Sequence, residues 1–300
     1  MPLWLVYSLL AVLGFGVWGL FSAAASKRLS PWQVQVFSTL GMVPVAVAAA
    51  FTKDFLVGKD LRRGSGWAFF TGAGTAVANV ALFTALNTGA EASVIFPLTG
   101  MFPLITISIA WVFLHERVGR FQKAGIGIAL AAILLFSIVD TGGLEAGGSN
   151  DGFRRSTWMG LSLICLVGWG VTGVTQKLAT RYISNGLSIV VYVVANLVVG
   201  VVVTLVHPLV WSIGWSAWAL CLAVGVCFGL GTLFLFAAYP AGGKVSIVST
   251  LGSLYPAITV VVAVPLFGER VTPLKLTGIV LALVAGVVLS RESSADATSV

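Results

Sequence analysis

Residues 98–118 read LTGMFPLITISIAWVFLHERV, and residues 251–271 read LGSLYPAITVVVAVPLFGERV. The two stretches carry a leucine, a proline, the pair Ile-Thr, an alanine and a closing Glu-Arg-Val at matching positions, 153 residues apart. Each stretch is apolar for most of its length and ends in a pair of opposite charges. This repeated segment predicts that the chain contains two copies of one unit.

The similarity extends on both sides of the repeated segment. Upstream and downstream residues match at the same offset, and the start of the chain matches the region after residue 167 at an offset of 154. The matched pairs are Gly72 with Gly225, Phe83 with Phe236, Ala85 with Ala238, Gly89 with Gly242, Gly125 with Gly278, Gly14 with Gly168, Gly16 with Gly170 and Gly19 with Gly173. Internal repeats of about half a chain are typical of membrane transporters.

The composition excludes a water-soluble globular protein. Of the 300 residues, 58% are hydrophobic and only 9% are charged, and the mean hydropathy is +1.02; a soluble domain has roughly 25% charged residues. Apolar runs of spanning length fall at 3–24, 32–52, 66–87, 90–114, 121–139, 156–180, 185–207, 213–238, 246–267 and 273–290. Because these runs lack the alternation of barrel strands, we expect ten membrane helices.

An odd number of helices in each copy determines how the copies are arranged. After five crossings the second copy enters the membrane from the opposite face, so the repeats are inverted. We therefore predict an all-α polytopic membrane protein with ten transmembrane helices in two inverted five-helix repeats, at residues 3–139 and 156–290. Residues 140–155 are the expected linker, and residues 291–300 are the expected cytoplasmic tail.

The distribution of basic residues predicts the orientation in the membrane. With ten crossings both termini share one face, and eleven of the seventeen Lys and Arg residues fall on that face. This excess predicts cytoplasmic termini in a bacterial-type inner (plasma) membrane. Lys27 and Arg28, which follow the first helix on the other face, argue against it. The basic residues are scattered singly, so no nucleic-acid-binding face is expected.

Several short motifs imitate cofactor or catalytic sites without the required context. Residues 14–19 and 168–173 fit G-x-G-x-x-G, but a dinucleotide site needs a preceding strand, so close helix packing or flexibility is favoured. Asp140 begins a D-T-G sequence without the second carboxylate of an aspartic protease. His115 and Glu116 lack the second histidine of a zinc site. We expect no cofactor, no metal and no enzymatic activity.

Charged helix ends and prolines are the candidates for moving parts. Glu116 and Glu269 end equivalent helices on opposite faces, where capping or interfacial ion pairing is expected and gating is the alternative. Glu91 and Lys244 also correspond by the repeat and are candidates for gating or proton coupling. In the fourth and ninth helices, prolines predict kinks or a broken-helix site. These prolines are Pro97, Pro103, Pro256 and Pro265.

The middle parts of the predicted spans contain no Asp, Glu, Lys or Arg. A cavity there would lack the carboxylates of a proton relay and the cations of a phosphate site, and it would suit a small neutral or zwitterionic solute with an apolar part. Trp18 and Trp169 lie nearer mid-membrane than the other tryptophans and are candidates for the cavity wall. Other polar groups in the spans can bond either a ligand or another helix. They are Asn79, Thr172, Gln176, Asn196, Thr232, Ser253 and Tyr255.

These residues give the chain a family resemblance. Val17-Trp18-Gly19, the stretch from Pro97 to Arg117 and its copy from Leu254 to Arg270 resemble the two EamA-type repeats of the drug/metabolite transporter superfamily. The resemblance covers residues 5–290 and implies ten helices with cytoplasmic termini. It also implies a central cavity lined by the first, third, fourth, sixth, eighth and ninth helices, with the fifth and tenth at the periphery. The cavity residues that it favours are Trp18, Asn79, Phe102, Trp169, Ser253 and Tyr255.

The chain is accordingly interpreted as a secondary transporter that moves a small organic metabolite across the inner membrane by alternating access. Similar members of the family export amino acids and related metabolites, which suggests export of such a solute. The expected partners are a small-molecule substrate and the lipid bilayer. A non-transporting membrane scaffold or lipid scramblase is the alternative. An intramembrane enzyme is more remote, because the spans supply neither a nucleophile with its base nor clustered carboxylates.

Overall fold

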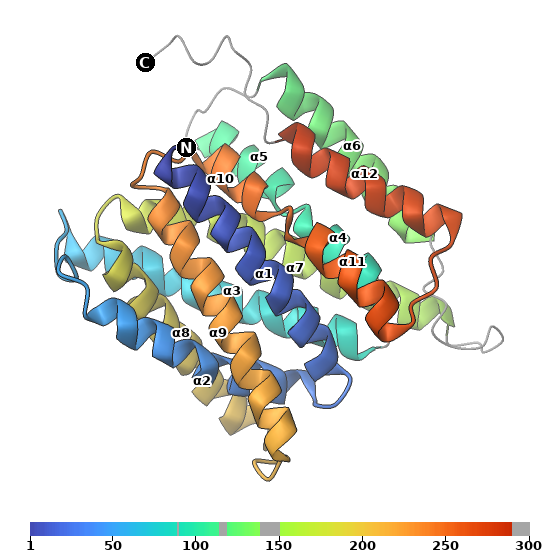
Figure 1. Ribbon diagram of the computed structural model, residues 1–300, viewed down its shortest axis with the longest axis horizontal. Helices are drawn as coiled ribbons and strands as arrows, with labels where there is room; N and C mark the ends of the chain where they lie inside the picture. Colours follow the sequence, from blue (N-terminus) through green and yellow to red (C-terminus); the bar gives the residue numbers. More distant parts are fainter. Residues whose placement is uncertain (89, 114–118, 139–150, 290–300) are drawn as a thin grey trace.

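The computed structural model describes residues 1–88, 90–113, 119–138 and 151–289, and this part of the chain is all helical apart from its turns and loops. Figure 1 shows the helices as one bundle. The helices are α1 (Leu3–Ser26), α2 (Pro31–Ala50), α3 (Leu61–Asn87), α4 (Ala92–Gly100), α5 (Pro103–Phe113), α6 (Arg120–Ile138), α7 (Asp151–Thr180), α8 (Asn185–Val206), α9 (Trp215–Ala238), α10 (Val245–Gly252), α11 (Tyr255–Phe267) and α12 (Pro273–Leu289).

Eight segments of the described chain are long and apolar enough to cross a membrane. They are α1, α2, α3, α4 together with α5, α7 from Thr157, α8, α9, and α10 from Ile247 together with α11. Helix α12 is a shorter apolar helix, and it packs along α6 at one edge of the bundle (Figure 1). The protein is therefore a multi-pass membrane protein.

The fourth and ninth apolar runs, for which the prolines predicted kinks or a broken-helix site, are each broken into two helices. The first break lies at Met101 and Phe102, and the second at Ser253 and Leu254. Pro103 begins α5 and Pro256 is the second residue of α11, where a missing backbone N–H costs no helical hydrogen bond. Pro97 and Pro265 lie inside α4 and α11. Short turns bridge both breaks, for example by a bond from Phe102 N to Thr99 O of 3.1 Å.

Matched capping residues begin the second helix of each repeat. The Ser30 hydroxyl accepts from the backbone N–H of Gln33, and the Ser184 hydroxyl accepts from that of Leu187. These serines lie 154 positions apart. A serine at this place satisfies one of the unpaired N–H groups at a helix start, so the same local chemistry begins α2 and α8.

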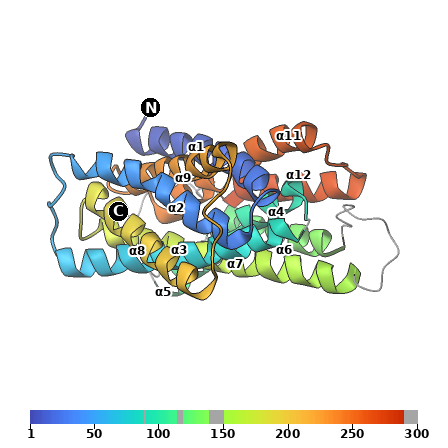
Figure 2. The same ribbon diagram turned by 90° about the horizontal axis from the view of Figure 1, so that it is seen from below.

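The two repeats are inverted. Tyr7 and Phe15 of α1 meet Phe234 and Phe228 of α9 in reverse order, so α1 and α9 run antiparallel. The helices α3 and α7 are antiparallel in the same way. Because two reversals of direction separate α1 from α3, these helices run in the same direction, and α7 therefore opposes α1. Figure 2 shows α1 and α7 running in opposite directions.

The repeats interlock rather than sit side by side as separate bundles. Helix α1 packs on α9 and α11 of the other repeat, and its counterpart α7 packs on α3 and α5. Likewise α2 packs on α9 and α8 packs on α3. Small residues allow this approach: a Cβ atom on Gly225 of α9 would overlap the Ser38 carbonyl oxygen and the backbone of Gly41 on α2.

One matched pair of hydrogen bonds joins the broken helices to the other repeat. The Thr106 hydroxyl in α5 donates to the Gly170 carbonyl in α7 at 2.9 Å, and the Thr259 hydroxyl in α11 donates to the Gly16 carbonyl in α1 at 3.0 Å. The two bonds are equivalent by the repeat, because Thr106 corresponds to Thr259 and Gly170 corresponds to Gly16. They confirm that the sequence repeat is a repeat of three-dimensional structure.

The bundle has two ends, which we call the terminal face and the opposite face. The terminal face contains the start of α1 and the loops at 51–60, 181–184 and 239–244, and α12 runs back to it. The opposite face contains the loops at 27–30, 207–214 and 268–272. The two faces lie at the upper left and lower right of Figure 1.

The close approach of α2 and α9 predicts the effect of added volume. We expect Gly225→Ala to lower the stability of the purified protein by about 1–3 kcal/mol, because backbone atoms must move to admit the methyl group. Gly160→Ala is the control, since no atom lies within 4 Å of its added Cβ. Thermal unfolding in detergent measures both, and equal unfolding temperatures for the two variants would contradict the packing argument.

Candidate substrate cavity

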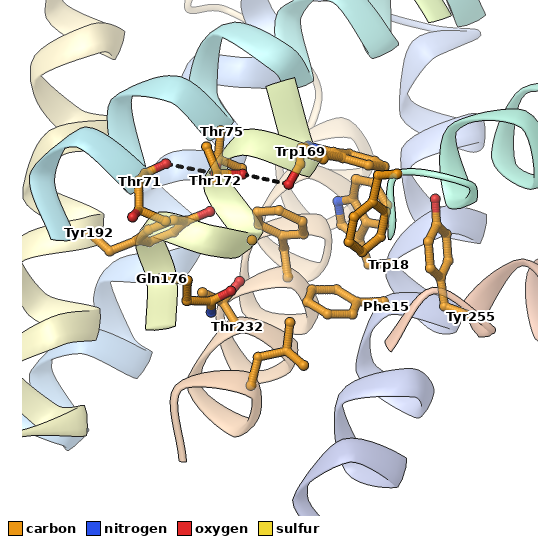
Figure 3. A pocket seen from close by; sticks show the side chains of 14 residues that line it. Phe15, Trp18, Thr71, Thr75, Trp169, Thr172, Gln176, Tyr192, Thr232 and Tyr255 are labelled. Atoms are coloured by element: carbon orange, nitrogen blue, oxygen red, sulfur yellow. Dashed lines mark hydrogen bonds between the residues drawn. The ribbon is translucent and has the colours of Figure 1, made fainter. Parts of the chain in front are cut away.

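A cavity lies between the two repeats, near the middle of the bundle. Its lining comes from α1, α3, α7, α8, α9, α11 and the break between α4 and α5, and Figure 3 shows it from close by. The lining residues are Phe15, Trp18, Thr71, Thr75, Phe102, Trp169, Thr172, Gly173, Gln176, Tyr192, Phe228, Thr232, Leu235 and Tyr255. None of these side chains is charged.

Aromatic rings form one end of the cavity. Trp18 is at the centre, with ring centroids 4.9 Å from Phe228, 5.6 Å from Trp169 and 5.9 Å from Tyr255. Phe102 lies in the break between α4 and α5, and Tyr255 begins α11 directly after the other break. The broken helices therefore deliver one aromatic side chain each to the same place. Such rings offer broad apolar faces to a ligand.

A buried hydrogen bond fixes the Trp169 ring. Its indole Nε1 donates to Oδ1 of Asn79 on α3 at 3.0 Å. The counterparts of these two residues in the other repeat are Phe15 and Thr232, which cannot reproduce the bond. One wall of the cavity is thus held by a polar bond that its symmetry mate lacks.

Hydroxyl groups form the other end, and most of them are already bonded to protein. The Thr71 hydroxyl lies 2.7 Å from that of Thr175, and the Thr75 hydroxyl donates to the Thr71 carbonyl. The Thr172 hydroxyl donates to the Trp169 carbonyl at 3.1 Å. These bonds stabilise the wall and leave few lining groups for a solute.

The cavity extends from mid-bundle toward the terminal face. Thr172 and Gln176 are in the half of α7 nearest that face, as are Thr232 and Leu235 in α9. At the equivalent position toward the opposite face, Trp18 replaces Thr172. A bulky ring therefore fills the space that is open on the other side. The open volume is about 70 Å³, below the several hundred Å³ of most ligand pockets, so rings must move to admit a metabolite.

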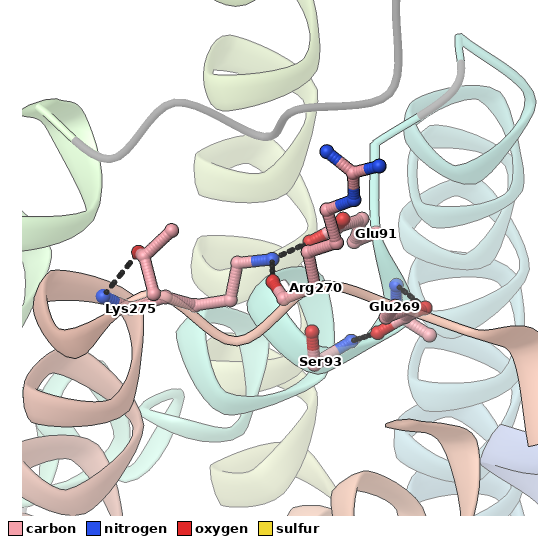
Figure 4. A network of polar contacts seen from close by, with 7 residues as sticks. Glu91, Ser93, Glu269, Arg270 and Lys275 are labelled. Atoms are coloured by element: carbon pink, nitrogen blue, oxygen red, sulfur yellow. Dashed lines mark hydrogen bonds and ion pairs between the residues drawn. The ribbon is translucent and has the colours of Figure 1, made fainter. Parts of the chain in front are cut away.

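Polar contacts join the two repeats at the opposite face (Figure 4). The Glu269 carboxylate accepts from the backbone N–H groups of Ala92 and Ser93, at 2.9 and 3.0 Å. It thereby caps the first turn of α4, where unpaired N–H groups favour a negative charge. Gly268 allows this approach, because its left-handed conformation, with φ of 65°, ends α11 and reverses the chain.

A lysine adds a second contact between the repeats at this face. We use the name latch for the two contacts together, the Glu269 cap on α4 and the ion pair of Lys275 with Glu91. Lys275 in the first turn of α12 donates to the carboxylate of Glu91 and to the carbonyl of Arg270. Its side chain is only 1% exposed, and that of Glu91 is 12% exposed. Nearby, the Lys27 Nζ lies 4.0 Å from the centre of the Phe267 ring. The latch therefore joins α4 of the first repeat to α11 and α12 of the second.

The structure distributes the candidate residues from the sequence among several places. Trp18, Phe102, Trp169 and Tyr255 line the cavity, whereas Asn79 lies behind Trp169. Ser253 donates to the Thr250 carbonyl and is not in the lining. Asn196 joins α8 to the Gly72 carbonyl of α3.

The charged candidates divide in the same way. Glu91 and Glu269 meet in the latch. Lys244 is at the start of α10, near the terminal face. Glu116 lies outside the described residues. Asp140 and His115 do so as well.

Sequence reasoning missed several lining residues and one latch residue. Phe15 is equivalent to Trp169 at the offset of 154, so the repeat alone could have identified it. Phe228 and Thr75 are also equivalent to each other, but one is aromatic and the other is a hydroxyl, so no shared residue type marks them. Tyr192 comes from α8, the seventh predicted span, which was not expected to contribute. Lys275 resembles any other loop-proximal lysine in the sequence.

Comparison with known proteins identifies the architecture. The model of the EamA-like transporter family matches residues 2–138 and again residues 156–291. The chain belongs to the EamA-like transporter family. Its membership makes it a membrane transporter of the drug/metabolite transporter type, with the two-repeat architecture of that family.

Solved structures share the fold of this EamA-like transporter. One of them, titled only "Crystal structure of protein", has a TM-score of 0.64 and 17% sequence identity, and the match covers 94% of each chain. At this identity the match describes the fold alone. A search of curated protein sequences gave no match. In the described part of the chain, no three His, Cys, Asp or Glu residues are grouped to hold a metal ion.

The bond between Trp169 and Asn79 predicts a non-additive pair of substitutions. Asn79→Leu and Trp169→Phe each leave one buried polar group unpaired, and each is expected to cost about 1–3 kcal/mol of stability. The double variant removes both groups and should cost clearly less than the two single effects combined. Thermal unfolding of the four proteins tests this, and additive costs would show that the bond contributes nothing.

Proposed function

We propose that this protein is a secondary transporter that moves a small organic metabolite across the inner membrane by alternating access, through the cavity between its repeats. The transported solute is a neutral or zwitterionic metabolite such as an amino acid, and the physiological direction is export. The chain crosses the membrane ten times, with both termini in the cytoplasm. The single observation that carries the proposal is an uncharged, aromatic-walled cavity at the interface of two interlocked inverted repeats.

The interlocking of the repeats supports alternating access. The major helix contacts of one repeat have counterparts made by the other, such as α1 with α9 and α7 with α3. Rocking one half against the other can therefore tighten one set of contacts while it loosens the equivalent set. The present arrangement is asymmetric, with the cavity toward the terminal face and the latch on the opposite face. An exchange would open the path that the latch now closes.

Unpaired hydroxyl groups beneath the latch support an opening on that side. Ser22, Ser26 and Ser93 are buried, and their hydroxyl oxygens have no hydrogen-bond partner in the described chain. All three lie in the half of their helices nearest the opposite face. Buried hydroxyls without partners are unfavourable, and water entering an opened path would satisfy them. Ser22 is also the repeat equivalent of Gln176, which lines the present cavity.

The proposed orientation and span count rest on charge and on α6 and α12. The basic residues concentrate at the terminal face, which favours the cytoplasm for that face. The helices α6 and α12 are equivalent and pack along each other, as expected for the fifth helix of each repeat. We propose that α6 and α12 are two further crossings, which would bring the eight longer segments to ten.

Transport itself is tested by counterflow into vesicles that contain the purified protein. The compounds come from a panel of amino acids, nucleosides, sugars and amines that is first screened for thermal stabilisation. We expect one neutral or zwitterionic class to exchange, and we expect Trp18→Ala and Trp169→Ala to reduce its exchange at least about tenfold. Gly160→Ala is the control. Wild-type transport in both tryptophan variants would disprove the cavity assignment, and no exchange of any compound would favour a scaffold or scramblase.

The latch predicts how accessible cysteines introduced on either side of Trp18 are to a water-soluble reagent. In a background with Cys165, Cys221 and Cys227 replaced by alanine, Ser22→Cys is expected to resist a water-soluble maleimide, whereas Thr172→Cys in the cavity reacts. Adding Glu269→Ala removes the cap on α4, at about 0.5–2 kcal/mol, and should raise labelling of Ser22→Cys roughly two- to thirtyfold.

Two comparisons make the latch experiment decisive. Arg28→Ala removes a charge from the same face without touching the latch and should leave labelling unchanged. If Glu269→Ala acts through the exchange of states, labelling of Thr172→Cys must fall as that of Ser22→Cys rises. A rise at both positions would indicate general loosening and would contradict a gate. Glu91→Gln with unchanged transport and pH dependence would remove Glu91 as a coupling residue.

A further inference from the structure

Gln176 differs from the hydrogen-bonded threonine side chains of the cavity lining. It is 6% exposed, it lines the cavity, and its amide makes no hydrogen bond within the described part of the chain. The hydroxyls of Thr71, Thr75 and Thr172 are all bonded to protein. Unlike the enclosed hydroxyl oxygens of Ser22, Ser26 and Ser93, the Gln176 amide borders the open space of the cavity, so a solute there can bond it.

A second unpaired donor lies at the aromatic end. Trp18 is 1% exposed, and its indole N–H makes no hydrogen bond within the described residues, in contrast to the bonded N–H of Trp169. Figure 3 shows Gln176 on the side of the cavity with Thr232, away from Trp18 and Tyr255. The cavity therefore has two separate unpaired polar positions, with aromatic rings between and around them.

The uncharged lining favours an uncharged partner for Gln176. No lining residue carries a charge, so an ammonium or carboxylate in the cavity would lose its water without gaining a counterion. The Gln176 amide offers both a donor and an acceptor, which matches a carboxamide or hydroxyl group, and the Trp18 N–H offers a donor to an acceptor oxygen. Aromatic rings favour a flat apolar body between these groups.

We infer that Gln176 binds the uncharged polar group of the substrate, and that this subsite selects neutral, ring-containing solutes over their charged and zwitterionic analogues. This inference rests on the proposed transport function. Within the proposed class of neutral or zwitterionic solutes it favours the neutral members, and it disfavours amino acids, which are zwitterionic. Gln176 has Ser22 as its equivalent in the other repeat, so the subsite belongs to one half only. The selection therefore acts when the cavity is on the side of the terminal face.

Four compounds with one ring and different charges test the inference. They are 2-phenylacetamide, phenylacetate, 2-phenylethylamine and phenylalanine, which are neutral, anionic, cationic and zwitterionic at pH 7. Thermal stabilisation of the purified protein gives the affinity for each compound. We expect 2-phenylacetamide to bind at least about tenfold more tightly than the other three. Equal or tighter binding of a charged compound, or no stabilisation by any of them, overturns the inference.

Substitution of Gln176 tests the subsite itself. Gln176→Leu keeps the volume but removes the amide, and it should weaken 2-phenylacetamide at least about tenfold. Gln176→Glu keeps the shape and adds a negative charge, so it should shift preference toward 2-phenylethylamine. Gln35→Leu is the matched control, because Gln35 is also a buried glutamine but lies on α2, outside the cavity.

The outcomes separate this inference from the proposed function. If Gln176→Leu binds the amide like wild type while Trp18→Ala weakens it, the cavity is correct and the subsite is wrong. If Gln35→Leu weakens binding as much as Gln176→Leu, the effect is general and the subsite is also wrong. Counterflow by the wild-type protein tests the transport function independently of the binding results for the Gln176 and Gln35 variants.

Discussion

The rest of the structure depends on one constraint, which is that backbone groups within a bilayer must find partners inside the protein. Both broken helices expose backbone in the middle of the bundle, and both are held against the other repeat. Thr106 reaches the Gly170 carbonyl and Thr259 reaches the Gly16 carbonyl. The broken segments are thus enclosed by protein, and the aromatic residues beside them, Phe102 and Tyr255, are directed to a common centre.

The two repeats share one helical arrangement but differ in some side chains. These differences determine where the cavity lies. Trp18 and Thr172 occupy equivalent positions, but only the tryptophan fills its side of the bundle. The Asn79 bond to Trp169 also has no counterpart. Under the proposed alternating access, two halves with identical side chains would favour both arrangements equally, so such differences would bias the molecule toward one of them.

The latch shows how a few polar groups can stabilise that arrangement. Glu269 belongs to the second repeat but caps α4 of the first, so separating the repeats at the opposite face leaves both groups unpaired until water reaches them. Lys275 and Glu91 add a largely buried ion pair across the same boundary. Pairs of this kind contribute little net stability when intact but are costly to break without solvent, which suits the reversible opening that the proposed alternating access would require.

The sequence by itself determined the membrane class, the duplicated unit, the family resemblance and most of the aromatic cavity wall. The membrane class and the duplicated unit follow from hydropathy, spacing and the matching of residues 98–118 with 251–271, which need no knowledge of distant contacts. The wall residues were those that the family resemblance implied, Phe102 among them. The sequence also singled out Glu91 and Glu269. Only the tertiary structure decided that these two residues meet at one face with Lys275, and that Asn79 supports Trp169 from behind.

The physical reason is that these contacts join residues far apart in sequence, 177 positions for Glu269 and Ala92. A repeat predicts which residues are equivalent, but it does not state which residues touch across the interface. The breaks at 101–102 and 253–254, and the position of the Gln176 amide in the cavity lining, likewise depend on how helices of the two repeats pack together.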